Sequence, residues 1–144
     1  MIPNFKKSGL LPAGIHPAIW GEFEKRFAHN PHRIVLLLGL KKALKLLYKY
    51  GSREIYVGGS FVTNELQPGD IDVCYDNTHM DWIGFLKQYP EFKPTKYGTK
   101  LQKKKFGCEF YTINAFEDNM VHFFQFDKEG NAKGIVKIAF IESL

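Results

Sequence analysis

The chain has 144 residues, enough for one domain with a substantial hydrophobic core. Hydrophobic residues make up 44% and charged residues 24%, as in an ordinary soluble globular protein. The net charge of +5 permits an anionic partner such as a nucleotide or RNA without requiring one. The apolar run 34–40 is too short to span a bilayer, and the N-terminus does not read as a signal peptide. We therefore expect a cytoplasmic protein with no membrane partner.

Hydrophobic spacing and turn residues predict a single α/β (α+β) domain over residues 1–144. The first part of the chain is expected to form an extended arm over 1–17, a helix over 17–28 and a longer helix over 31–50. A strand over 54–57, a turn over 58–60, a strand over 70–75 and a helix over 79–89 should follow. The last part should contain a lysine-rich loop over 93–105, strands over 106–113 and 120–126, and the closing strand of a C-terminal hairpin (120–144) over 134–140. Asn30 is the expected N-cap of the longer helix, with Pro31 at its first position. Cys74 and Cys108 have no metal-binding spacing and are expected to be reduced and buried.

The most informative segment joins a glycine turn to a pair of aspartates. Gly-Gly-Ser at 58–60 is followed by nine residues and then by Asp-Ile-Asp-Val at 70–73. Side chains alternate between the faces of a strand, so Asp70 and Asp72 share one face while the intervening apolar residues can pack on the longer helix. Carboxylates at i and i+2 lie ~7 Å apart at their Cα atoms. Both can therefore reach a pair of divalent ions ~3.5–4 Å apart.

Gly58, Gly59 and Ser60 form the predicted phosphate-binding half of the site. Glycine lets the backbone approach a phosphate closely, and neighbouring backbone N–H groups would point at the negative charge. The Ser60 hydroxyl can donate one further hydrogen bond. Mg²⁺ suits the nearby carboxylates, because it prefers oxygen ligands and completes its shell with water and substrate phosphate. The segment therefore indicates phosphoryl or nucleotidyl transfer.

The combination of Gly59, Ser60, Asp70 and Asp72 resembles the nucleotidyltransferase superfamily, typified by DNA polymerase β and the small bacterial minimal nucleotidyltransferases. The resemblance covers about residues 31–113. It implies the nucleotidyltransferase fold, with a mixed β-sheet, helices packed on one face and the metal site on the other. It also implies that a nucleoside triphosphate binds at the Gly-Ser turn, that two Mg²⁺ ions are held by the aspartates, and that a nucleotidyl group passes to a hydroxyl. The arm and long helix also look like a family of small uncharacterised bacterial proteins, which adds no chemistry.

Members of this superfamily usually add a third acidic residue from a neighbouring strand. It helps to hold the catalytic metal and can accept the proton of the attacking hydroxyl. Glu109 is the best match, because its neighbours Cys108 and Phe110 are apolar and would turn Glu109 toward the two aspartates. Asp76 and Glu117 are the weaker alternatives.

Lysines are concentrated between residues 93 and 105. At the mouth of the predicted cleft they could clamp phosphates or guide an RNA acceptor, with Tyr97 available for base stacking. Lys100 and Lys103 are the candidates for contacting the nucleotide. The alternative is a solvated, mobile loop with no ligand.

The favoured interpretation is a Mg²⁺-dependent nucleotidyltransferase that moves a nucleoside monophosphate from a triphosphate to a hydroxyl of RNA, tRNA included, or of a protein. Such an enzyme could belong to a toxin–antitoxin or defence system. A second hypothesis is a catalytically weak antitoxin or binding module of the same fold that recognises a toxin or antitoxin partner, which the small size of the chain favours. A third is an RNA-binding protein that uses the lysine-rich loop.

Overall fold

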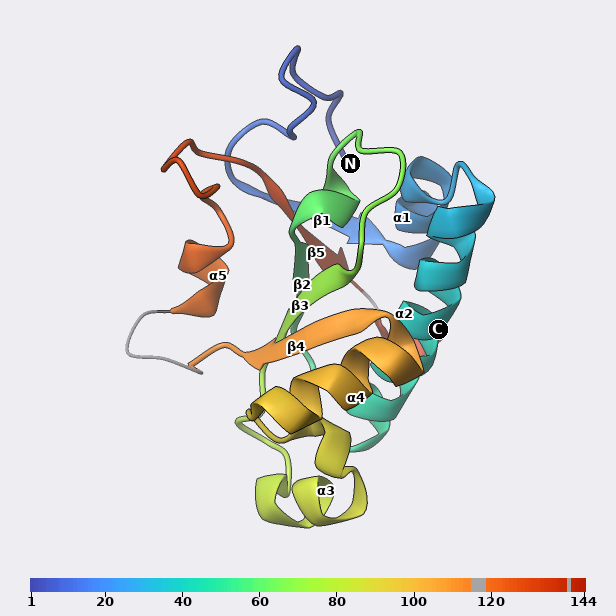
Figure 1. Ribbon diagram of the computed structural model, residues 1–144, viewed down its shortest axis with the longest axis vertical. Helices are drawn as coiled ribbons and strands as arrows, with labels where there is room; N and C mark the ends of the chain where they lie inside the picture. The colour runs from blue at the N-terminus through green and yellow to red at the C-terminus, as the bar shows by residue number, and fades with distance from the viewer. Residues whose placement is uncertain (115–118, 140) are drawn as a thin grey trace.

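A computed structural model describes residues 1–114, 119–139 and 141–144 as an α/β protein (Figure 1). Within these ranges, five strands form one mixed sheet in the order β1-β5-β2-β3-β4. The strands are β1 (Ile15–Ile19), β2 (Ile55–Gly58), β3 (Ile71–Tyr75), β4 (Cys108–Thr112) and β5 (Ile135–Ala139). The helices are α1 (Trp20–Phe27), α2 (Pro31–Lys49), α3 (Trp82–Gln88), α4 (Lys96–Phe106) and α5 (Met120–Phe123). The single 3₁₀ turns are η1 (Ser60–Val62), η2 (Pro90–Phe92) and η3 (Ile141–Ser143).

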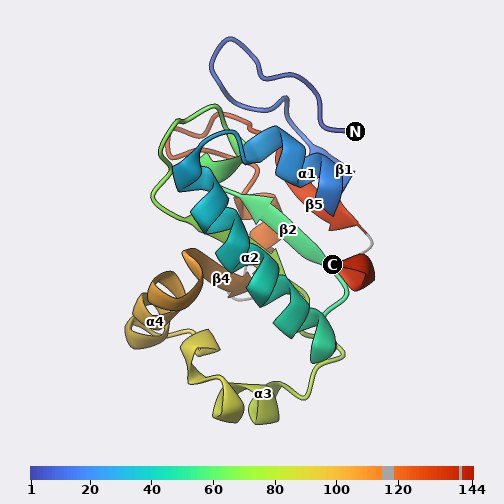
Figure 2. The same cartoon turned by 90° about the vertical axis from the view of Figure 1, so that its right-hand side faces the viewer.

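The two faces of the sheet are covered differently. On one face, the alternate strand residues Ile71, Val73 and Phe110 join the main core with residues of α1 to α4. On the other face, α5 packs over a smaller cluster that includes Tyr56 and Cys74. Figures 1 and 2 show α2 crossing one side of the strands, and Figure 1 shows α5 on the opposite side. The expectation that helices pack on one face is therefore right for α1 to α4 and wrong for α5.

Helix α2 begins where the sequence predicts. The Asn30 side chain accepts a hydrogen bond from the Arg33 backbone N–H at 2.9 Å, and Pro31 occupies the first helical position. The leucines of one α2 face are buried in the main core. None of the described helices is long and apolar enough to cross a membrane.

Two segments have a secondary structure other than the predicted one. The lysine-rich segment is helix α4, which Thr95 caps by accepting a hydrogen bond from Gly98 N at 3.0 Å, and which ends at Gly107 with φ 68°. Residues 120–123 form helix α5, with the Asn119 side chain accepting from Val121 N at 2.8 Å. In α4 the Thr95 cap acts together with lysine, leucine and glutamine residues that favour a helix, whereas in α5 the Asn119 cap outweighs an aromatic composition.

The predicted C-terminal hairpin is right only at its turn, which an isolated antiparallel bridge between Phe126 and Ala132 closes, and wrong in its two strands. Strand β5 lies between β1, to which it is parallel, and β2, to which it is antiparallel. The arm expected to be extended contributes β1 at the sheet edge, and the first helix begins at Trp20 rather than at Pro17. Pro17 is tolerated in β1 because an edge strand can leave one backbone position without a donor. Strands from outside the predicted core of 31–113 thus complete the same sheet.

Arg33 holds the segment between β2 and β3 against α2. Its side chain has no exposed surface, and its guanidinium donates hydrogen bonds to the carbonyl oxygens of Phe27, Phe61, Thr63 and Glu65 at 2.6–3.2 Å. Burial lowers the Arg33 pKa, an effect that the nearby Glu65 charge opposes. A planar group with five N–H donors can satisfy this many carbonyl groups at once, which no other side chain can do.

We predict that Arg33→Met destabilises the protein by at least about 3 kcal/mol, because it leaves several buried carbonyl groups without donors. Urea unfolding followed by circular dichroism measures the loss. Arg53→Met is the matched control, since the exposed Arg53 guanidinium lies 3.9 Å from the Tyr48 ring centroid and donates to two carbonyls. Its expected cost is under about 1 kcal/mol. Equal losses in the two variants would contradict the role assigned to Arg33.

Candidate metal centre

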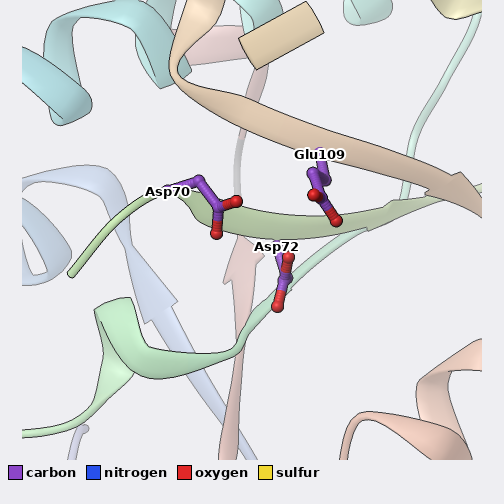
Figure 3. A group of neighbouring side chains, drawn as sticks. All are labelled: Asp70, Asp72 and Glu109. Atoms are coloured by element: carbon purple, nitrogen blue, oxygen red, sulfur yellow. The ribbon is translucent and has the colours of Figure 1, made fainter. Parts of the chain in front are cut away.

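Strand pairing brings the predicted acidic residues together. Asp72 on β3 lies opposite Gly58 on β2 and opposite Glu109 on β4. Carboxylate oxygens of Asp70, Asp72 and Glu109 lie within 4.8 Å of one another. Figure 3 shows the three side chains gathered where β3 and β4 run side by side. We call these three residues the acidic triad. Its members are all partly buried.

Gly59 must be glycine for two independent reasons. Its backbone has φ 75°, which favours a residue without a Cβ atom. A Cβ atom at this position would also collide with the Asp72 carboxylate. Gly58 has a different role, because a Cβ there would meet the ring of Phe124, the C-cap residue of α5, at 3.0 Å. The glycine pair thus brings the backbone close to the triad through Gly59 and lets α5 pack closely through Gly58.

The turn after Gly59 offers free hydrogen-bond donors. Among the described residues, none accepts a hydrogen bond from the backbone N–H of Ser60 or Phe61. The Ser60 hydroxyl likewise has no hydrogen-bond partner in the described part of the chain, although the Ser60 carbonyl accepts from Thr63. Unpaired N–H groups beside a glycine are what an anionic oxygen requires.

Lys103 extends from α4 and contacts two of the three acidic residues. Its Nζ atom lies 2.7 Å from Glu109 Oε1 and 3.3 Å from Asp70 Oδ2. The hydrogen bond with Glu109 is the main reason why the Lys103 pKa is raised. The sequence suggested Lys103 as a nucleotide contact, and the structure places its ammonium group directly on the triad.

The triad carboxyls differ in protonation. Burial, and then the charges of Asp70 and Glu109, raise the pKa of Asp72 to about 7. Burial acts on Glu109 in the same direction, but hydrogen bonds from Lys103 and from the Tyr111 hydroxyl outweigh it and lower the Glu109 pKa. The Tyr111 hydroxyl donates to Glu109 Oε2 at 2.7 Å. Glu109 is therefore held as a carboxylate, whereas Asp72 binds a proton near neutral pH.

A cavity of about 1050 Å³ opens beside the triad, lined by Gly59, Asp72 and Glu109 on the sheet side. Sequence reasoning missed its opposite wall, formed by these residues of α5 and the loop after it: His122, Phe123, Phe126, Lys128 and Lys133. Phe123 is 62% exposed and Phe126 41% exposed, so neither is explained by core packing. The aromatic run suggested a strand, and only the Asn119 cap could have indicated a helix.

The other described residues that the sequence suggested for the site do not lie in the acidic triad or in this cavity. Lys100 lines a different cavity, on the α4 side of β4. Asp76 follows β3 and accepts hydrogen bonds from Thr78 instead of joining the triad. Glu117 lies outside the described residues. Cys74 and Cys108 are free and buried, as expected.

The chemistry of the donor set fits a divalent cation. Three carboxylates converge, and their like charges add to burial in raising the pKa of Asp72. Mg²⁺ prefers oxygen ligands of this kind and needs only a few from the protein. Asp70, Asp72 and Glu109 are the residues that would hold it, and Lys103 supplies part of the positive charge that the triad otherwise lacks.

The raised Asp72 pKa predicts how stability depends on pH in the presence of EDTA. Folded protein keeps a proton on Asp72 that unfolded protein releases between the ordinary pKa of 3.8 and about 7, so stability falls as pH rises through that window. Asp72→Asn removes this penalty and should stabilise the protein at pH 8, relative to pH 5, by about 2–4 kcal/mol. Urea unfolding at both pH values measures the effect, and Asp76→Asn is the control. A gain that is equal at pH 5 and pH 8 would refute the assignment.

Lys103 should compete with a bound divalent cation. Lys103→Met removes an ammonium group that contacts two potential ligands, so the affinity for Mn²⁺ or Mg²⁺ should rise by a few-fold to about tenfold. Isothermal titration calorimetry measures the affinity. Lys104→Met, the adjacent exposed lysine of α4, should leave it unchanged. Weaker cation binding by Lys103→Met would show that the lysine does not compete.

Comparison with known proteins gives a family but no function. No curated protein and no solved structure matches the chain. One family model matches residues 3–139, and its description is a family of unknown function, DUF6932. Since this match includes all the strands and the complete acidic triad, the chain belongs to that family.

Proposed function

We propose that this protein is a Mg²⁺-dependent nucleotidyltransferase that moves a nucleoside monophosphate from a triphosphate to a hydroxyl group. The observation that carries the proposal is the juxtaposition of two features. Three carboxylates converge within 4.8 Å, and the unpaired N–H groups of the Gly59 turn lie beside them. One binds cations and the other binds anions, which is the combination that a metal–triphosphate complex requires.

The adjoining cavity supports the same function. Its volume of about 1050 Å³ is sufficient for a nucleotide. Its far wall presents the exposed rings of Phe123 and Phe126, suited to stacking on a base. The loop in the same wall carries both charges, with Lys128 and Lys133 suited to phosphate beside Asp127 and Glu129. A nucleotide therefore meets aromatic and lysine side chains on one side and Asp72 and Glu109 on the other.

The residues act mainly by binding and orientation. The triad would hold the ions, which when bound neutralise phosphate charge and align the attacking and leaving oxygens. The N–H groups after Gly59 bind phosphate oxygens. The acceptor oxygen forms a bond to the α-phosphorus as the bond to pyrophosphate breaks, and the hydroxyl proton passes to a carboxylate or to water. Glu109, whose pKa is lowered by Lys103 and Tyr111 in spite of its burial, is better suited to be a ligand than a base.

A binding module of the same architecture is the second candidate. Lys103 already balances part of the triad charge without a cation. Such a module would recognise a toxin or antitoxin partner without transferring a nucleotide.

We predict that Asp70→Asn and Asp72→Asn each lower nucleotidyl transfer by at least about 100-fold while the protein remains folded. The assay follows label from α-³²P nucleoside triphosphates, with Mg²⁺, into total RNA or protein. Asp76→Asn, at the end of the same strand but outside the triad, is the matched control and should retain transfer.

Full activity of either triad variant would contradict the mechanism. If the wild-type protein binds Mg²⁺ and nucleotide in calorimetry but no label is transferred to any acceptor, the binding-module candidate is supported instead. Circular dichroism spectra of all variants establish that a loss of transfer is not a loss of fold.

A further inference from the structure

A second cavity lies on the α4 side of β4 and meets the first cavity at Tyr111. It has a volume of about 950 Å³ and lies among α3, the first half of α4 and the end of β4. Tyr111 lines both cavities, and its hydroxyl donates to Glu109 Oε2 at 2.7 Å. In the sheet order β2-β3-β4, the Gly59 turn follows β2, whereas Glu109 is on the edge strand β4. If a triphosphate binds at the Gly59 turn, the β4 side of the triad remains open to the acceptor.

The walls of this second cavity combine aromatic rings with the amide of Gln102. Trp82, Phe92 and Phe110 contribute rings; Phe92 and Phe110 are buried in the main core, whereas Trp82 is only half-buried. Gln102 lines the cavity and is 1% exposed. Its Oε1 atom accepts from Phe110 N at 2.9 Å, while its amide nitrogen has no acceptor among the described residues. Stacking surfaces beside free amide donors suit a nucleobase, whose ring nitrogens and carbonyl groups are acceptors.

The charge of the second cavity is opposite to that of the triad. Lys96 and Lys100, one turn apart on α4, line it, and none of its described lining residues is acidic. The N-terminal end of α4, capped by Thr95, adds a partial positive charge at the same place. Lys93 and Lys104, also exposed, extend the basic surface beyond the cavity. An anionic ligand can therefore bind here without a metal, and a ligand longer than one nucleotide gains further contacts.

We propose that this second cavity binds the terminal nucleotide of a single-stranded RNA acceptor. The base stacks on the half-buried Trp82 ring, at the edge of the buried Phe92 and Phe110 rings, and the adjacent phosphate lies at Lys96 and Lys100. The ribose hydroxyl groups then face Tyr111 and, through it, Glu109. The inference rests on the proposed function, because it supplies the acceptor for the transfer, but binding of RNA at this place can be measured without any transfer.

The test measures binding of a fluorescein-labelled five-nucleotide RNA with a free 3′-hydroxyl, in EDTA and without triphosphate. Anisotropy gives the affinity of the wild-type protein, of Lys96→Gln/Lys100→Gln and of the control Lys6→Gln/Lys7→Gln, whose lysines in the N-terminal arm line neither cavity. Lys96→Gln/Lys100→Gln should bind the RNA at least tenfold more weakly than wild type. The slope of log K against the logarithm of the salt concentration should be smaller in magnitude by about 1.4. The control should bind within about twofold of wild type.

Tryptophan fluorescence locates the bound RNA. Unlabelled RNA of the same sequence should quench the emission of the wild-type protein, and Trp82→Phe should abolish the quenching while a phenylalanine ring keeps measurable affinity. Equal affinities of the two double lysine variants, quenching that persists in Trp82→Phe, or RNA binding only with Mg²⁺ would each overturn the inference.

The two proposals can fail separately. RNA binding at Trp82 with no label transfer to any acceptor would leave this inference standing and remove the enzyme. Label transfer that Asp72→Asn abolishes, together with no RNA binding in EDTA, would leave the enzyme and remove the RNA site. A protein acceptor would then be indicated by label in the protein fraction.

Discussion

The buried guanidinium of Arg33 is the interaction on which the geometry of the site depends. It binds carbonyl oxygens of Phe61, Thr63 and Glu65, and these three residues come directly after the Gly59 turn. This segment is irregular apart from one 3₁₀ turn, so its carbonyl groups would otherwise lack partners or face water. With them fixed to α2, the turn has one position relative to β3, and Gly59 can lie against the Asp72 carboxylate. An arginine distant from the triad therefore determines where a phosphate could bind.

Strand β3 has a different task on each face. Ile71 and Val73 lie in the main core, whereas Asp72 faces the cavity, as strand alternation predicts. The sequence alone predicts these two faces of β3, because successive side chains of a strand point to opposite sides of the sheet whatever the neighbouring strands are. Glu109 could be predicted on the same argument, once its apolar neighbours were noted. The start of α2 was also predictable, because its Asn30 cap and Pro31 are local signals.

The rest depends on contacts that no local pattern reveals. The contact of Lys103 with Glu109 requires α4 to pack beside β4. The lysine-rich composition is compatible with a helix, but it does not show against which strand that helix packs. The helix α5 was hidden because an aromatic run favours a strand by composition and only the Asn119 cap favours a helix. Arg33 was missed because the carbonyls it binds come from a segment about thirty positions away. An arginine side chain on a helix normally faces solvent, so only the tertiary structure reveals that Arg33 is buried.

The place of β5 in the sheet has a consequence for how the protein is made. Among the described strands it comes last in sequence, yet it lies between β1 and β2, and it pairs with both. The three strands that carry the glycine turn and the triad are neighbours in both sequence and space, so they can associate early during synthesis. Until β5 emerges from the ribosome, however, β1 has no partner strand and one edge of β2 is open. The nascent chain thus exposes an unpaired strand edge until β5 is available, and chaperone binding or aggregation at that edge would compete with closure of the sheet.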